Sequence, residues 1–308
     1  MDATVPGSVP PAETESLHNA SAPTEQAGEG CPTPLAWQEV LTAFRTESQP
    51  WQVTHGECTI TGKTFGQGPP LYLLCGMGGT HELLALFVWL LKDQFRCVLY
   101  DYPEYGRQPT LDDFAADLFA MADAQGDERF DLFATSFGTM VALRAMRIAP
   151  ERVGRAVLQG GFAHRQLSWA ERRAIGIYTR VPWQYRSVPL REPIQRNNHQ
   201  TWFPPFDATR WQFFLENTGG IRARAMAQRG AIIRDSDLRP ELAQISQPTL
   251  LVHGEGDGLA PLEDAELLQH GLPHARLEVL HTTGHIPYLT HPHRLRKVVE
   301  EFLQAAAP

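Results

Sequence analysis

The chain has 308 residues, of which 43% are hydrophobic and 20% are charged, so it is long enough for one large α/β domain or two ordinary ones. Its formal net charge of -8 leaves no surplus of basic residues for binding nucleic acid or an anionic membrane surface. No apolar run approaches the roughly 18 residues that a membrane-spanning helix needs. We therefore expect a protein that acts on a small-molecule substrate, without nucleic-acid or membrane partners.

The first 33 residues differ in composition from the rest of the chain. They are rich in Pro, Ala, Glu, Ser and Thr and carry almost no large apolar side chains, so we expect a disordered tail over residues 1–33. The same residues lack the apolar run of a secretory signal. The cysteines are scattered without a C-x-x-C pair, which favours a reducing, cytoplasmic location over a disulfide framework or a zinc site; they are Cys31, Cys58, Cys75 and Cys97.

Residues 34–161 predict alternating strands and helices. A helical pattern over 34–46 is followed by a β-hairpin over 51–65, and continuous apolar runs then alternate with amphipathic segments. Continuous apolar strands are typical of parallel sheets that are covered on both faces. The expected strands are 71–75, 96–100, 131–135 and 155–159, and the expected helices between them are 81–92, 111–124 and 138–148.

The alternation is interrupted once, by residues 162–247. This segment is too long for a loop of a compact domain and has helical patterns of its own at 169–178, 210–216 and 222–233, so we interpret it as a helical cap insertion. Strands at 249–253 and 276–280 and helices at 262–270 and 293–305 resume the series within residues 248–308. The sequence thus predicts a doubly wound, mostly parallel α/β sheet in two parts, 34–161 and 248–308, with an inserted cap.

The clearest chemical motif lies between the strand 131–135 and the helix 138–148. Residues 134–138 read Ala-Thr-Ser-Phe-Gly, which matches the nucleophile elbow G-x-S-x-G with Ala in the first place. Such a turn projects the hydroxyl of Ser136 above the sheet, and small flanking residues are needed because strand and helix nearly touch there. A string of this kind also arises by chance, so Ser136 needs partners.

A serine hydroxyl becomes nucleophilic when an imidazole removes its proton and a carboxylate orients that imidazole. Asp257 follows the strand 249–253, and His285 follows the strand 276–280, preceded by a glycine that gives its loop freedom. Glu255 is an alternative acid, with Asp257 then capping the next helix. His281 is an alternative base, but it directly ends a strand. His253 is expected to be a hydrogen-bonded strand residue.

Acyl transfer also requires donors for a developing oxyanion. Two backbone N–H groups are suitable: that of Phe137, at the start of the helix after the elbow, and that of Met77, in the Gly-Met-Gly-Gly turn after the strand 71–75. A glycine-rich turn also serves as a plain connection in many proteins, so Met77 alone is a weak signal.

With these residues in place, the chain from residue 71 to its end resembles the α/β-hydrolase superfamily, specifically capped members related to esterases, C–C bond hydrolases, epoxide hydrolases and proline iminopeptidases. The matching pieces are the runs 66–71 and 76–79, the elbow, and the runs 254–261 and 283–285. The resemblance favours Asp257 over Glu255. It implies a Ser136–His285–Asp257 triad that cleaves an ester, amide, thioester or activated C–C bond through an acyl-enzyme or related intermediate, without a cofactor or a metal.

Two departures from the family pattern keep other functions open. Cys75 replaces the usual histidine before the oxyanion turn, and the loop after the strand 96–100 reads Asp-Tyr-Pro-Glu-Tyr-Gly-Arg from Asp101. The latter loop is similar to that of maspardin, a family member regarded as a binding protein, which lacks a complete triad. The alternatives are therefore a non-catalytic binding protein and an acyltransferase that uses the same three residues.

Three further patterns are weaker. Gly62-Lys63-Thr64 lacks the glycine spacing and the helix of a phosphate-binding loop. The histidines between His281 and His293 lack the helical spacing of a zinc hydrolase. Four tryptophans of the expected cap would divide between its core and the wall of an acyl pocket; they are Trp169, Trp183, Trp202 and Trp211.

Overall fold

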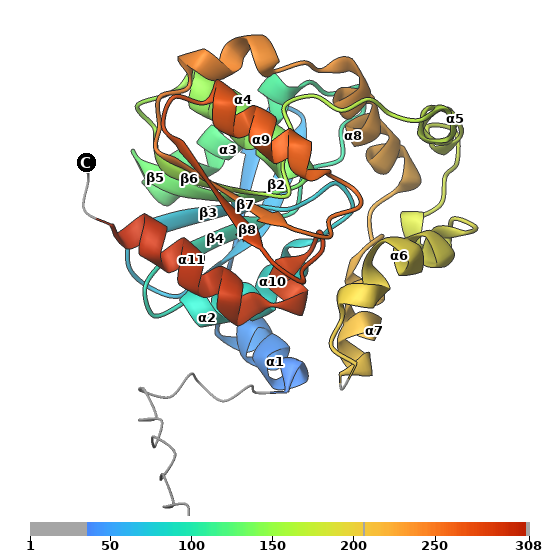
Figure 1. Cartoon of the computed structure of the whole chain (residues 1–308), viewed down its shortest axis with the longest axis horizontal. Helices are drawn as coiled ribbons and strands as arrows, with labels where there is room; N and C mark the ends of the chain where they lie inside the picture. The colour runs from blue at the N-terminus through green and yellow to red at the C-terminus, as the bar shows by residue number, and fades with distance from the viewer. Residues whose placement is uncertain (1–35, 206, 306–308) are drawn as a thin grey trace, which may run out of the picture. The chain divides into compact units, whose positions relative to one another are not determined.

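The structure is a computed structural model in which residues 36–205 and 207–305 are described. The tail expected over residues 1–33 and Cys31 lie outside the described residues. Figure 1 shows a sheet covered by helices on both faces, with a further group of helices on one side. No helix of the described chain combines the length and apolarity needed to cross a membrane.

Within the described residues, one sheet of eight strands forms the centre of the fold, in the order β1-β2-β4-β3-β5-β6-β7-β8. The first two strands form an antiparallel hairpin, β2 pairs antiparallel with β4, and every later pairing is parallel. The mostly parallel sheet predicted from the sequence is thereby confirmed. The strands are β1 (Gln49–His55), β2 (Cys58–Phe65), β3 (Pro70–Leu74), β4 (Arg96–Tyr100), β5 (Phe130–Thr135), β6 (Val153–Gln159), β7 (Thr249–Gly254) and β8 (Ala275–Leu280).

The burial of the strands follows their sequence patterns. Strand β7 reads Thr-Leu-Leu-Val-His-Gly and is buried at every position, as a central parallel strand must be. Strand β8 at the edge alternates between half-buried and exposed positions until Leu280. Because parallel strands share one direction, β5, β7 and β8 bring the loops that follow them to a single edge of the sheet.

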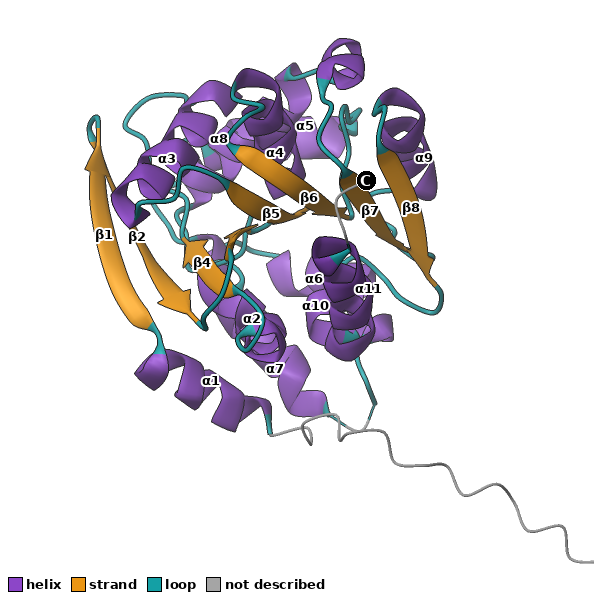
Figure 2. Cartoon of the chain, turned by 90° about the vertical axis from the view of Figure 1, so that its left-hand side faces the viewer, coloured by secondary structure: helices purple, strands orange, loops and turns teal. Residues whose placement is uncertain are grey.

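Helices cover both faces of the sheet (Figure 2). Leu118 and Met140 belong to the packed cluster on one face, and Phe87 and Val299 belong to the cluster on the other. The first face carries α3 (Leu111–Gln125), α4 (Phe137–Ile148) and α9 (Leu262–Gly271); the second carries α1 (Trp37–Glu47), the 3-10 turn η1 (His81–Leu84), α2 (Ala85–Leu91), α10 (Pro287–Thr290) and α11 (Pro292–Gln304).

Residues 162–247, hereafter the insert, connect β6 to β7 and form the group of helices on the right of Figure 1. Its elements are α5 (Trp169–Tyr178), η2 (Tyr185–Ser187), α6 (Arg191–His199), η3 (Gln200–Trp202), α7 (Ala208–Asn217), α8 (Ala223–Asp235) and η4 (Arg239–Gln244). The three helices predicted here are present as α5, α7 and α8. Helix α6 was not predicted, because Arg-Glu-Pro-Ile-Gln-Arg-Asn-Asn-His has one apolar residue besides its proline and no apolar period.

Candidate active site

Ser136 lies in a sharp turn between β5 and α4. Its φ of 54° and ψ of -122° place a residue with a side chain in a strained region of backbone conformations. The packing of the turn explains its small neighbour, since a Cβ on Gly138 would lie 2.7 Å from the carbonyl oxygen of Leu74. The strand-to-helix elbow expected from the sequence is therefore present at Ser136.

His285 and Asp257 meet behind this turn. The Nδ1 of His285 lies 2.6 Å from Oδ2 of Asp257, and both side chains are buried. The other oxygen of Asp257 accepts backbone N–H bonds of 2.9 Å from Leu259 and Ala260. Burial alone would raise the pKa of Asp257, but the nearby imidazole and these N–H donors outweigh it, so the pKa lies below its usual value. The carboxylate is thus held in its charged form, aimed at the imidazole.

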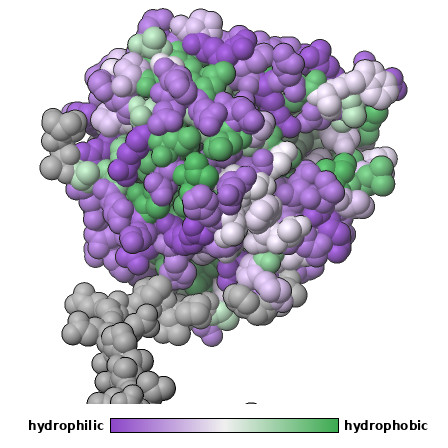
Figure 3. Space-filling view, viewed as in Figure 1, coloured by the Kyte–Doolittle hydropathy of each residue, from purple (hydrophilic) through white to green (hydrophobic). Residues whose placement is uncertain are grey.

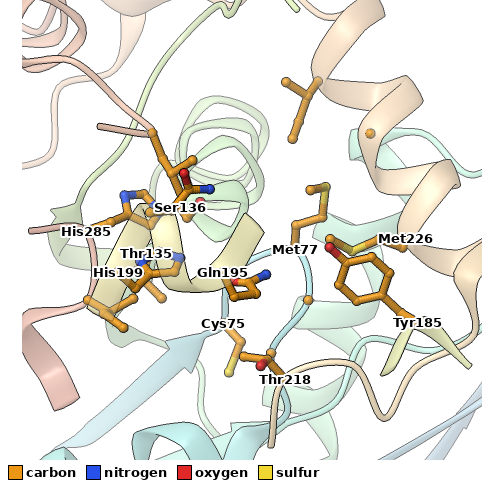
Figure 4. Close-up of a pocket in the computed structure, with 18 of the residues that line it drawn as sticks. Cys75, Met77, Thr135, Ser136, Tyr185, Gln195, His199, Thr218, Met226 and His285 are labelled. Carbon is orange, nitrogen blue, oxygen red and sulfur yellow. The ribbon is translucent and has the colours of Figure 1, made fainter. Parts of the chain in front are cut away.

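Ser136 and His285 line the same cavity (Figure 4). The hydroxyl of Ser136 makes no hydrogen bond to the imidazole in the described chain. Such bonds are often long in an enzyme without its substrate and shorten when the substrate binds. The predicted acid and base are therefore in direct contact, and the predicted nucleophile lines the same cavity as the base.

The competing acid and base form a separate pair at the surface. Glu255 lies 3.4 Å from His281, and their side chains are 55% and 75% exposed. Glu255 also accepts a 3.0 Å bond from the backbone N–H of Thr282. His253 is buried in β7 with its Nε2 2.8 Å from the carbonyl oxygen of Ala260, the hydrogen-bonded position expected for it. None of these three groups lines the cavity that contains Ser136.

The Gly-Met-Gly-Gly turn follows β3 and forms part of the cavity wall through residues 76–79. Phe137 is the first residue of α4, so its N–H has no acceptor within the helix. Over the described part of the chain, the N–H groups of Met77 and Phe137 have no hydrogen-bond acceptor. Met77 thus lines the cavity and Phe137 directly follows Ser136 in the elbow, and the N–H group of each is free to donate a hydrogen bond.

The cavity has a volume of about 290 Å³, and most of its wall is apolar. The turn after β3 and the elbow form one side, and the insert forms the other. The expectation that tryptophans of the insert line this cavity is wrong: Trp211 is buried in the core, Trp169 and Trp183 are exposed, and Trp202 packs elsewhere. The apolar residues that the insert supplies are instead Phe162, Leu167, Ala174, Ile175, Ile194, Phe214, Met226, Ala227 and Ile233.

The sequence of the chain is similar to those of known proteins. Residues 69–292 match the α/β hydrolase fold family. The chain belongs to that family. A pimeloyl-[acyl-carrier protein] methyl ester esterase of Nitrosomonas europaea is 31% identical over 250 residues, which cover 75% of this chain and 94% of the relative. An esterase of the same name from Aeromonas hydrophila is 24% identical over 260 residues, covering 80% and 99%.

Solved structures of this α/β hydrolase's relatives agree on the fold. A hydrolase from Pseudomonas aeruginosa superposes with a TM-score of 0.72 at 24% identity, over 84% of this chain and 99% of that one. An enol-lactonase from Burkholderia xenovorans gives a TM-score of 0.72 at 20% identity, over 83% of this chain and 100% of the other. At these identities the likeness concerns the fold, and the chemistry must be argued from the residues.

Two buried polar groups of the hydrolase's cavity were not found from the sequence. His199, at the end of α6, is 4% exposed, and its ring centre lies 6.1 Å from that of His285. Burial and the neighbouring His285 lower the pKa of His199 to about 3, so its imidazole is neutral. The Nδ1 of His199 and the Oε1 of Gln195 have no hydrogen-bond partner among the described residues. Because α6 has no apolar period, nothing in the sequence pointed to these side chains.

Trp202 of the insert packs against both loops that carry the acid and the base. A Cβ on Gly256 would lie 2.0 Å from the indole ring, and one on Gly284 would lie 2.3 Å from it. Neither glycine has a positive φ. Gly284 is therefore required for space rather than for the loop freedom expected of it, because the indole of Trp202 occupies the position that a side chain would need.

The weaker sequence patterns have structural roles elsewhere. Lys63 and Thr64 lie within β2, where no helix follows them, so they do not form a phosphate-binding loop. Cys58, Cys75 and Cys97 are buried free thiols. Within residues 36–205 and 207–305, no group of three or more His, Cys, Asp or Glu side chains is placed to hold a metal ion.

Proposed function

We propose that the protein is a serine-dependent hydrolase of carboxylic esters. Ser136 is the nucleophile, His285 is the general base, and Asp257 orients and stabilises the imidazole. The observation that carries the proposal is the buried 2.6 Å contact between His285 and Asp257 behind the strained turn of Ser136. The esterase relatives support the choice of an ester bond.

In this proposal the ester is hydrolysed in two steps. In the first, Ser136 Oγ attacks the ester carbonyl as His285 takes its proton; the tetrahedral intermediate collapses, the alcohol leaves with that proton, and an acyl-serine remains. In the second, water attacks the acyl-serine, His285 accepts a proton from the water, and the proton returns to Ser136 as the acid is released. The charged Asp257 stabilises the imidazolium of each step. The N–H groups of Met77 and Phe137 receive the negative charge on the carbonyl oxygen.

The insert supplies most of the acyl-binding surface in this account and acts as a cap over the sheet edge. Its apolar residues face Ser136 across a cavity of about 290 Å³, which suits a short or medium acyl chain. His199 and Gln195 would offer hydrogen bonds to a polar group on that chain or on the leaving alcohol. The relatives act on the methyl ester of a pimeloyl group held by a carrier protein. We therefore extend the proposal to esters of acyl chains that carry a second polar group.

A panel of p-nitrophenyl esters from acetate to octanoate tests the proposal. Each methylene that enters the cavity should raise kcat/KM by up to about fourfold, from about 0.8 kcal/mol of burial, until the cavity is full. Ser136→Ala should abolish hydrolysis, whereas Ser187→Ala, on an exposed residue of the insert, should match the wild type. Equal rates from the wild type and Ser136→Ala would refute the mechanism. Transfer to an added alcohol that outruns hydrolysis would instead indicate an acyltransferase.

A further inference from the structure

Two carbonyl groups flank the peptide that carries the Met77 N–H, and a side chain holds each of them. The hydroxyl of Tyr102 donates a 3.1 Å bond to the carbonyl oxygen of Cys75. The guanidinium of Arg229 donates a 2.6 Å bond to the carbonyl oxygen of Met77. The peptide between them, which joins Gly76 to Met77, is therefore held on both sides. Neither side chain belongs to the turn itself, since Tyr102 follows β4 and Arg229 lies in α8 of the insert.

Arg229 is buried to an unusual degree for a charged residue. It is 2% exposed, and its guanidinium lies 5.0 Å from the ring centre of Tyr102 while a second donor reaches the carbonyl oxygen of Tyr102 at 3.3 Å. No carboxylate of the described chain lies within ion-pair distance of it. Asp101, the acid with the strongest influence on Arg229, is engaged by His81 through its backbone N–H at 2.7 Å and its Nδ1 at 3.0 Å.

The groups in direct contact with the guanidinium of Arg229 are consequently carbonyl oxygens and an aromatic face, while the carboxylates of Asp101 and Glu104 act on it from beyond ion-pair distance. Burial lowers the pKa of Arg229, but a guanidinium keeps its proton in proteins. A buried cation without a counter-ion is costly, and a negative charge that forms nearby relieves part of that cost. The nearest place where the proposed reaction forms such a charge is the carbonyl oxygen of the substrate at the Met77 N–H.

We propose that Arg229 is a positioning residue of the oxyanion turn, which holds the Met77 carbonyl so that the adjoining N–H faces Ser136 and places a positive charge behind it. Tyr102 assists by holding the Cys75 carbonyl. The inference rests on the proposed function, because it assumes that an oxyanion forms. It also assigns a role to both departures from the family pattern, since Cys75 and the Tyr102 loop contact each other at this turn.

Through Arg229, the insert becomes part of the catalytic geometry. Helix α8 brings Arg229 to the turn, so a shift of the insert changes the position of an oxyanion donor as well as the acyl cavity. The turn and the insert also meet through backbone groups, since the N–H of Gly219 donates a 3.1 Å bond to the carbonyl oxygen of Gly78. The oxyanion turn thus depends on the insert at two points.

The test compares Arg229→Met, Arg229→Lys and Tyr102→Phe with Arg224→Met. Arg224 is an exposed arginine of the same helix that bonds the carbonyl oxygen of Gly106. We expect Arg229→Met to lower kcat by about 10–100-fold with KM changed less than about threefold, because an oxyanion is stabilised only in the transition state. Arg229→Lys should restore part of kcat, Tyr102→Phe should lose about 3–10-fold, and Arg224→Met should match the wild type.

A trifluoromethyl ketone, whose adduct with a serine carries an oxyanion, separates this role from a merely structural one. Its inhibition constant should rise in Arg229→Met by the same factor as kcat/KM falls, while the inhibition constant of the carboxylic acid product stays unchanged. If Arg229→Met does not fold, the inhibition constants of the same two compounds are measured with Arg229→Lys and Tyr102→Phe, and these decide whether the proposed role is correct. The inference would be overturned if the affinities for both inhibitors fell by the same factor, or if these variants kept the kcat of the wild type. A wild type that hydrolyses no ester would instead refute the proposed function.

Discussion

The sheet edge and the insert differ in how they hold their side chains. At the sheet edge, Ser136, Asp257 and His285 follow three strands whose burial and pairing set the positions of the loops. The insert packs less completely: all the exposed large hydrophobic side chains of the described chain belong to it except that of Ile148. Figure 3 shows apolar surface at the right-hand edge, where the insert helices lie in Figure 1, and a larger apolar area to the left of the centre. In the proposed function, the sheet edge would carry the reaction and the insert would select the substrate.

The sheet edge and the insert are not independent of each other. Three side chains of the insert reach the loops at the sheet edge: Arg229 at the oxyanion turn, Trp202 at the glycines of the acid and base loops, and His199 beside His285. The insert therefore contacts the loops at the sheet edge as well as lining the cavity. The following experiments test where the boundary between the two regions lies.

The largest effect is expected at the sheet edge, from Asp257→Asn. An amide would hold His285 in the wrong tautomer, and we expect kcat to fall by about 10³–10⁴-fold. The matched control is Glu255→Gln, which changes the exposed acid of the Glu255–His281 pair. Steady-state kinetics of both variants against a p-nitrophenyl ester provide the measurement. A larger loss of kcat in Glu255→Gln than in Asp257→Asn would indicate that Glu255, and not Asp257, is the acid that orients the catalytic imidazole.

The second effect concerns the packing of the insert against the rest of the protein. Trp211 is 8% exposed and packs against the rings of Phe203 and Phe214, whereas Trp169 is 73% exposed. Trp211→Ala should lower the free energy of unfolding by about 3–5 kcal/mol, while Trp169→Ala should change it by less than about 0.5 kcal/mol. Urea denaturation measures both. Equal losses would show that Trp211 adds no packing to the cluster that joins the insert to the sheet.

The third effect tests the contact between the two regions. Gly256→Ala should cost about 2–3 kcal/mol of stability, because its Cβ would meet the Trp202 indole at 2.0 Å. In a Trp202→Ala background the same change should cost less than about 0.5 kcal/mol, so the double-mutant cycle isolates the clash. Gly258→Ala is the matched control, since no atom lies within 4 Å of its Cβ position. An equal cost in both backgrounds would exclude the indole as the cause.

The smallest effect is the pH dependence that His199 contributes. Burial, with the nearby His285, holds the pKa of His199 at about 3 instead of 6.5, so below pH 6.5 the unfolded chain binds a proton that the folded chain does not. The free energy of unfolding should therefore fall as the pH drops, by about 2 kcal/mol from this group at pH 5. Between pH 7 and pH 5, the free energy of unfolding of His199→Leu should fall by about 2 kcal/mol less than that of the wild type. Urea denaturation at both values is the measurement, and equal losses would refute the assignment.

How much the sequence could predict differs between the regions for a physical reason. Continuous apolar strands and the order of Ser136, Asp257 and His285 after them are local patterns, so the sheet and its site candidates could be predicted. The geometry also distinguishes Asp257 from Glu255, which a sequence pattern alone leaves open. Helix α6 and the neighbours of Arg229 and Trp202 depend on packing between segments far apart in the chain, and no local pattern encodes them.

Labelling with a fluorophosphonate tests the central claim most directly, because the reagent reacts with a serine that a neighbouring imidazole activates. The account predicts one adduct per chain by intact mass, mapped to Ser136, absent in Ser136→Ala and at least about 10³-fold slower in His285→Gln. An adduct on another residue, or labelling of His285→Gln at the wild-type rate, would contradict it.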